Sequence, residues 1–121
     1  MKILAAIAVL IVATLHGGFL VLEMFFWDHE IGRKAFDMTP ELSAETALLA
    51  ANQGLYNGFL AAGLLWGVIA GKRDVVFFFL LCVIVAGIFG AITVMPRIIF
   101  TQATPAIIAL ILTFLAGKKA N

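Results

Sequence analysis

Long apolar runs fill most of this chain and alternate with short polar stretches. Four runs reach about 20 residues, the length that an α-helix needs to cross the hydrocarbon core of a bilayer. They predict helices at roughly residues 3–26, 40–70, 75–95 and 98–116, of which the second has its apolar part at 48–70. The second helix is predicted to begin at Pro40, because Thr39 suits the N-cap position and proline suits the first helical turn.

The connections between the predicted helices set their arrangement. Residues 71–74 join the second helix to the third, and Pro96 with Arg97 joins the third to the fourth. Connections this short make neighbouring helices antiparallel. We therefore expect an all-α fold in a single domain, residues 1–121, in which four antiparallel transmembrane helices form an up-down-up-down bundle. The longest connection, residues 27–39, is polar.

Composition and charge support a membrane protein and indicate its orientation. The chain is 64% hydrophobic and 12% charged, unlike ordinary soluble domains, and its net charge of +1 argues against a nucleic-acid partner. The first apolar run continues past Leu20 without a small-residue cleavage site, so we expect a retained helix and not a signal peptide. The positive-inside rule favours an N-in and C-in orientation. The inner basic residues are then Lys2, Lys72, Arg73, Lys118 and Lys119, and the outer ones are Arg33, Lys34 and Arg97.

The segment ANQGLYNGFLAAG, residues 51–63, places four hydrogen-bonding side chains in an otherwise apolar helix. These side chains are Asn52, Gln53, Tyr56 and Asn57. At about 100° per residue they fall within an arc of about 140° and form one polar face. Counting back about 20 residues from Gly71 places this face in the outer half of the membrane.

Two other helices are predicted to bring polar side chains to the same layer. Glu23 lies near the outer end of the first helix, one turn before Trp27, whose indole suits the membrane interface. Gln102 lies at the matching depth in the fourth helix, and His16 lies about 10 Å deeper in the first. Small residues at helical spacing permit close helix packing: Gly54 with Gly58 and Gly63 with Gly67 in the second helix, and Ala86, Gly87, Gly90 and Ala91 in the third. The pair Gly63 and Gly67 lies beneath the polar layer. The sequence therefore predicts a polar pocket that is open outward or sideways and has a packed floor.

Each of these residues also has a simpler interpretation. The amides of the second helix can serve only as interhelical hydrogen bonds, and His16 can be a core histidine bonded to a carbonyl. Glu23 can reach water from a position near the interface, although an ionisable group in a membrane helix is a functional-site candidate by default. His16 and His29 are too far apart along the chain for a metal site, so none is predicted, and no cofactor motif is present.

Four segments carry a family resemblance: LEMFFW at 22–27, GRKAF at 32–36, ANQGLYNGFLAAGL at 51–64 and TQATPAIIAL at 101–110. Together they resemble the family of small four-helix integral membrane proteins catalogued as domain of unknown function 1304. The resemblance implies a multi-pass protein of the bacterial cell (inner) membrane and implies no activity. The small multidrug transporters are likewise four-helix chains with a glutamate in the first helix. In that family the carboxylate lies mid-membrane, whereas Glu23 is predicted near one face.

Three functions remain open at this point. The leading hypothesis is a pocket that binds an amphipathic or isoprenoid-like small molecule, with Glu23 as a candidate acid/base group, and whether the protein is an enzyme is left open. The other predicted ligand contacts are Asn52, Gln53, Tyr56, Asn57, Gln102, Trp27 and His16. The alternatives are a proton-coupled exporter of the small-multidrug type that acts as a dimer, and a structural membrane subunit. The lipid bilayer is the expected partner in each case, a homo-oligomer stays open, and no nucleic acid is expected.

Overall fold

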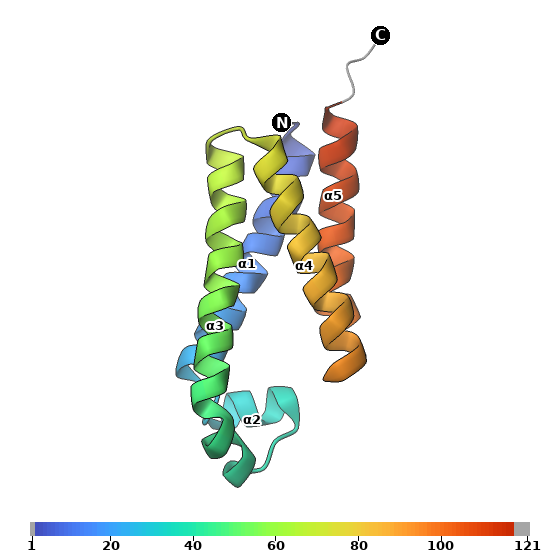
Figure 1. Cartoon of the computed structure of the whole chain (residues 1–121). Coiled ribbons are helices and arrows are strands. Elements are labelled where there is room, and N and C mark those ends of the chain that lie inside the picture. The colour runs from blue at the N-terminus through green and yellow to red at the C-terminus, as the bar shows by residue number, and fades with distance from the viewer. Residues whose placement is uncertain (1, 118–121) are drawn as a thin grey trace. The chain divides into compact units, whose positions relative to one another are not determined.

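The computed structural model describes residues 2–117, and within that range the protein is all-helical, as the apolar runs predict. Five α-helices and one π-helical segment follow one another along the chain (Figure 1). They are α1 (Ile3–Phe25), α2 (Glu30–Phe36), α3 (Pro40–Ile69), α4 (Arg73–Thr93), η1 (Ile99–Ala103) and α5 (Thr104–Ala116). Lys118 and Lys119, two of the basic residues expected on the inner side, lie outside the described residues.

Three helical stretches are long and apolar enough to cross a membrane: α1, α4 and the stretch Ile99–Ala116 that joins η1 to α5. The longest helix, α3 with 30 residues, is not among them. Its polar side chains, Asn52, Gln53 and Asn57 among them, lower the hydropathy of the segment that would lie in lipid. Three of the four expected spans therefore have the length and composition of membrane helices, and the four-helix transmembrane bundle stays a prediction.

The chain divides into two compact units. We call Met1–Leu15 together with Leu60–Asn121 the apolar unit, and His16–Phe59 the polar unit. The first half of α1 and the last third of α3 belong to the apolar unit, and the remaining parts of both helices belong to the polar unit.

Small residues allow the helices of the apolar unit to pack closely. Its core consists of Val9, Val12, Ala13, Leu64, Val76, Leu80, Val83, Ala106 and Ala109. Within this unit α4 and α5 run antiparallel beside one another (Figure 1). α4 also packs on η1 at Gly87, where an added Cβ would lie 2.7 Å from the backbone nitrogen of Ala103. This contact confirms that the small residues expected in the third span permit close packing.

The chain between α4 and α5 contains a π-helical turn, η1, that the sequence analysis does not predict. The Thr104 N–H donates to the Ile99 carbonyl, and the Thr104 hydroxyl donates to the same oxygen at 2.9 Å. Pro105 follows directly, and a proline inside a helix has no N–H and crowds the carbonyl four residues before it. A wider turn before the proline relieves that crowding, so the predicted helix 98–116 is divided into η1 and α5.

The polar unit contains a second unpredicted element, the short helix α2 in the connection 27–39. His29 caps α2, because its Nδ1 accepts a hydrogen bond from the Ile31 N–H at 3.2 Å. Gly32 lies directly against the end of α1, where an added Cβ would meet the carbonyl oxygens of Phe26 and Trp27. At the start of α3 the Leu42 N–H donates to Thr39 Oγ1 at 3.2 Å, which confirms Thr39 as the N-cap.

Ser43 links α3 to the end of α1 within the polar unit, and its removal should lower stability. Its side chain is fully buried, and Oγ donates to Asp28 Oδ1 at 2.7 Å. Asp28 also accepts from Arg33 Nη1 at 3.0 Å. Replacing Ser43 with alanine should lower the free energy of unfolding by about 1 kcal/mol, measured by unfolding in mixed micelles. Thr14→Val is the control and should cost nothing, because that exposed hydroxyl donates only to its own helix, at Leu10 O.

Candidate functional site

Two polar side chains from different helices meet inside the polar unit. Asn57 Nδ2, from α3, donates a hydrogen bond of 2.6 Å to Glu23 Oε2, from α1. Asn57 is 4% exposed, and Glu23 is half-buried. The sequence analysis predicts that the polar face of the second helix meets Glu23 at the same depth, and this contact is present.

Two glycines of α3 bring the helices close enough for this contact. An added Cβ at Gly54 would lie 3.1 Å from both Glu23 Cβ and Leu20 O, and one at Gly58 would meet the side chain of Leu20. Gly54 and Gly58 are four residues apart and lie on one side of α3. Asn57 is three residues after Gly54 and therefore lies toward the same side. The small-residue ridge predicted for the second helix thus faces α1 and carries the amide toward the carboxyl group.

The other three residues of the predicted polar face lie on the surface of the chain. Asn52, Gln53 and Tyr56 are exposed, and within the described residues their polar groups have no hydrogen-bond partner. The Tyr56 ring contacts Phe59 edge to face, with ring centroids 5.8 Å apart. We call Asn52, Gln53, Tyr56 and Asn57 the α3 polar face; one side of it is buried against α1 and the rest is open.

One carboxyl oxygen of Glu23 is available as a hydrogen-bond acceptor. Its Oε2 accepts from Asn57, whereas its Oε1 has no hydrogen-bond partner within the described residues. A half-buried carboxyl group with one unpartnered oxygen can accept a hydrogen bond from a bound molecule. The amides of Asn52 and Gln53 can both donate and accept, and the Tyr56 hydroxyl can do the same.

Trp27 and His16 have partners within the polar unit. Trp27 Nε1 donates to Thr46 Oγ1 at 2.9 Å, and its ring packs on Phe36 at 4.8 Å between centroids. His16 is fully buried and contacts the Phe19 ring edge to face at 5.3 Å. Trp27 therefore ties the end of α1 to both α2 and α3, and His16 lies in packed surroundings.

Gln102, the remaining predicted contact, lies in the apolar unit. It belongs to the π-helical turn η1, and its side chain is half-buried. The depth argument places it on a regular helix, whereas the wider turn at Ile99–Ala103 changes the direction in which each of its side chains points.

Sequence reasoning missed Thr46 and Arg73. Thr46 is the partner of the Trp27 indole, and Arg73 donates to the carbonyl of Thr113 at 2.9 Å. Arg73 carried a signal, because a basic residue at the first position of a helix opposes the helix dipole and therefore suggests another partner. Thr46 carried none, because its hydroxyl also bonds its own helix at Leu42 O.

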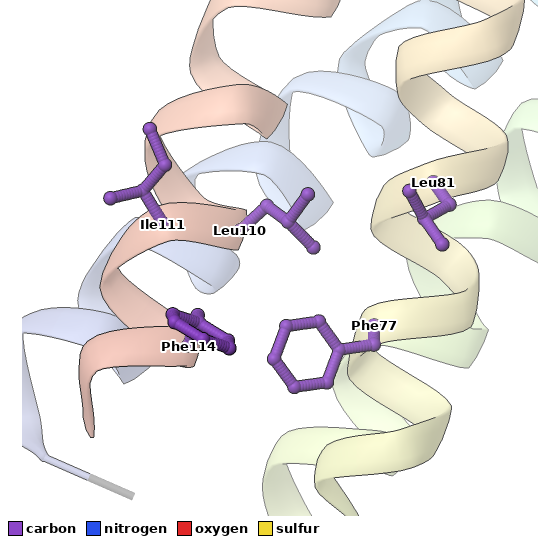
Figure 2. A pocket seen from close by; sticks show the side chains of 5 residues that line it. All are labelled: Phe77, Leu81, Leu110, Ile111 and Phe114. Carbon is purple, nitrogen blue, oxygen red and sulfur yellow. The ribbon is translucent and has the colours of Figure 1, made fainter. Parts of the chain in front are cut away.

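Hollows lie on α1 and between α4 and α5, and the side chains that line them include no predicted site residue. One, of about 260 Å³, is lined by Leu10, Ile11, Thr14 and Leu15 of α1. The other, of about 300 Å³, is lined by five apolar side chains of α4 and α5 (Figure 2). Among residues 2–117, no three His, Cys, Asp or Glu side chains come close enough together to hold a metal ion.

Comparisons with known proteins cover almost the whole chain. Residues 10–114 match the family described as "Protein of unknown function (DUF1304)". An uncharacterised protein named YpaA, from Lactococcus lactis subsp. lactis strain IL1403, is 31% identical over 118 residues, which span 94% of this chain and 99% of that relative. No solved structure matches. The matched range includes every predicted site residue.

Proposed function

The chain belongs to the DUF1304 family of proteins of unknown function, and we propose that it binds a small amphipathic or isoprenoid-like molecule through Glu23 and the α3 polar face. The observation that carries the proposal is the pair formed by Glu23 and Asn57. One carboxyl oxygen of Glu23 stays without a partner within the described residues. The exposed polar groups of Asn52, Gln53 and Tyr56 on the same α3 polar face also have none there. Polar groups that face hydrocarbon are costly unless a partner satisfies them.

The surroundings of the polar groups favour an amphipathic molecule. Leu55 and Phe59, which flank Tyr56 on α3, are large apolar side chains with about half of their surface exposed, 43% and 53%. A ligand with a polar head and an apolar tail could satisfy both kinds of surface from within the bilayer. Such a ligand enters sideways from the lipid and needs no deep cavity.

The proposal gives the predicted site residues different roles. Glu23 is the acid/base or charge partner of the ligand, and Asn52, Gln53 and Tyr56 bind its polar head. Asn57 orients the Glu23 carboxyl group. Trp27 and the fully buried His16 support the polar unit from within, and Gln102 stays a proposed contact from the fourth span.

The proposal includes a location and an orientation. We place the protein in the bacterial cell (inner) membrane, with α1, α3, α4 and the stretch from η1 to α5 crossing it and both termini inside. A 30-residue helix is about 45 Å long, which is more than enough to cross the hydrocarbon core. The excess of basic residues at the chain ends and in the connection 71–74 supports this orientation.

Native mass spectrometry of protein gently extracted from its own membrane tests the proposal. Wild type should carry a discrete adduct, and Glu23→Gln and Asn52→Leu should each lose most of it. Tyr56→Phe removes a single exposed hydroxyl and should weaken the adduct without affecting the fold. Thr93→Val is the matched control, because that hydroxyl bonds only its own helix at Phe89 O.

Two results would contradict the proposal. One is an adduct that persists unchanged in all three site variants, which would place the ligand elsewhere. The other is a pH-driven dye efflux from liposomes that depends on Glu23, which would assign the carboxyl group to transport. A stable protein partner with no small-molecule adduct would instead favour a structural subunit.

A further inference from the structure

The hollow between α4 and α5 has a purely apolar lining. Phe77 and Leu81 of α4 face Leu110, Ile111 and Phe114 of α5 across it, and the two phenylalanine rings point toward one another (Figure 2). None of these five side chains carries a polar atom. The hollow holds about 300 Å³ and lies entirely within the apolar unit.

A basic side chain lies at one end of this hollow. The guanidinium carbon of Arg73 lies 5.5 Å from the centroid of Phe77, one of the lining rings. Arg73 Nη2 donates to the carbonyl of Thr113 at 2.9 Å and more weakly to that of Phe114 at 3.5 Å. An added Cβ at Gly117 would meet the guanidinium group, so Arg73 lies across the last turn of α5.

Within residues 2–117, no carboxylate pairs with the positive charge of Arg73. Among residues 2–117 it forms no ion pair, Nη1 has no hydrogen-bond partner, and the buried Nε has none either. The contacts with the α5 carbonyls use Nη2 alone. The neighbouring cation, Lys72, contacts the exposed ring of Trp66 at 5.1 Å and has no carboxylate partner in the same range. Arg73 therefore places a positive charge at one end of the apolar hollow, and Lys72 and the acidic Asp74 are its neighbours in the sequence.

We infer that this hollow binds an anionic phospholipid, with an acyl chain between α4 and α5 and the headgroup phosphate at Arg73. Phosphate oxygens accept charge-assisted hydrogen bonds from a guanidinium group, and Nη1 is the nitrogen of Arg73 that is neither buried nor partnered among residues 2–117. Basic residues beside a groove between membrane helices favour anionic headgroups, whereas a zwitterionic lipid gains little net attraction. The inference uses none of the residues of the α3 polar face, so it stands or fails independently of the proposed function.

Quenching by brominated lipids tests the inference at the hollow itself. Ile111→Trp in a background of Trp27→Phe and Trp66→Phe places the only indole in the lining. The protein is reconstituted in phosphatidylcholine vesicles that contain either brominated phosphatidylglycerol or brominated phosphatidylcholine with matched chains. The quenching of the Trp fluorescence should give an association constant for phosphatidylglycerol that is about five-fold higher than that for phosphatidylcholine. Arg73→Gln should reduce this preference to about one, and Arg73→Lys should keep part of it.

Controls separate a specific site from ordinary lipid contact. The reporter Phe89→Trp, near the other end of α4, should show no preference between the two lipids. High salt should weaken the preference in the intact protein, which tests the charge even if Arg73→Gln reduces helicity. Equal quenching by both lipids with Arg73 in place would overturn the inference. An absence of quenching by either lipid would also overturn it, because the hollow would then be covered by another chain.

Discussion

Replacing Gly87 with alanine should lower the free energy of unfolding by about 2 kcal/mol, because the added methyl group meets backbone that cannot move aside. The new Cβ would lie 2.7 Å from the nitrogen of Ala103 and 3.0 Å from its Cβ. Ala103 is fully buried in the π-helical turn η1, so relief requires α4 to separate from that turn. Unfolding in mixed micelles, followed by circular dichroism, measures the loss.

Gly90 on the same helix is the matched control. An added Cβ there would lie 3.3 Å from the Cγ2 of Ile98, a side-chain atom that can shift. Gly90→Ala should therefore change stability by less than about 0.5 kcal/mol, since it adds a methyl group without a backbone clash. Equal losses for the two variants would show that α4 does not pack on η1 at Gly87.

The helices and the central polar contact could be predicted from the sequence, because each rests on a regular period. Long apolar runs define α1 and α4, and Thr39 with Pro40 marks the start of α3. Counting residues from the ends of two antiparallel helices is enough to bring Glu23 and Asn57 to the same depth. The counting predicts that Glu23 lies at the depth of the whole polar face, and Asn57 is the residue of that face that bonds Glu23.

The elements that sequence reasoning missed depend on tertiary contacts. The helix α2 has only seven residues, too few to be stable alone, and it is held by the approach of Gly32 to the carbonyls of Phe26 and Trp27. The turn η1 depends on where the chain accommodates Pro105, which no local pattern specifies. The position of Arg73 depends on the distance between α4 and the end of α5.

The extent of burial across the α3 polar face also could not be predicted. An arc of about 140° is wider than the line of contact between two helices, so one helix can cover only part of it. The structure buries Asn57 beside α1 and leaves Asn52, Gln53 and Tyr56 exposed. Asn57 therefore has the interhelical role that the simpler interpretation gives to the amides. The exposed side chains of the face stay available for the ligand-binding role.

Removing the buried amide should destabilise the protein strongly and in a way that depends on Glu23. Asn57→Leu leaves the half-buried carboxyl group without its one partner and should cost about 2 kcal/mol. The double variant Glu23→Leu/Asn57→Leu should lose less unfolding free energy than the two single variants lose together, by about 1 to 2 kcal/mol. Unfolding of the wild type, the two single variants and the double variant in the same micelles measures this coupling.

Asn52→Leu provides the contrast that separates helix packing from ligand binding. Asn52 is exposed and has no partner in the described chain, so its replacement should leave stability unchanged and should not couple to Glu23→Leu. Additive losses for Asn57 and Glu23, within about 0.5 kcal/mol, would contradict the contact between them. If Asn52→Leu has normal stability and carries no adduct, the exposed side of the α3 polar face binds the ligand. Normal stability with an unchanged adduct would exclude Asn52 from the ligand contacts.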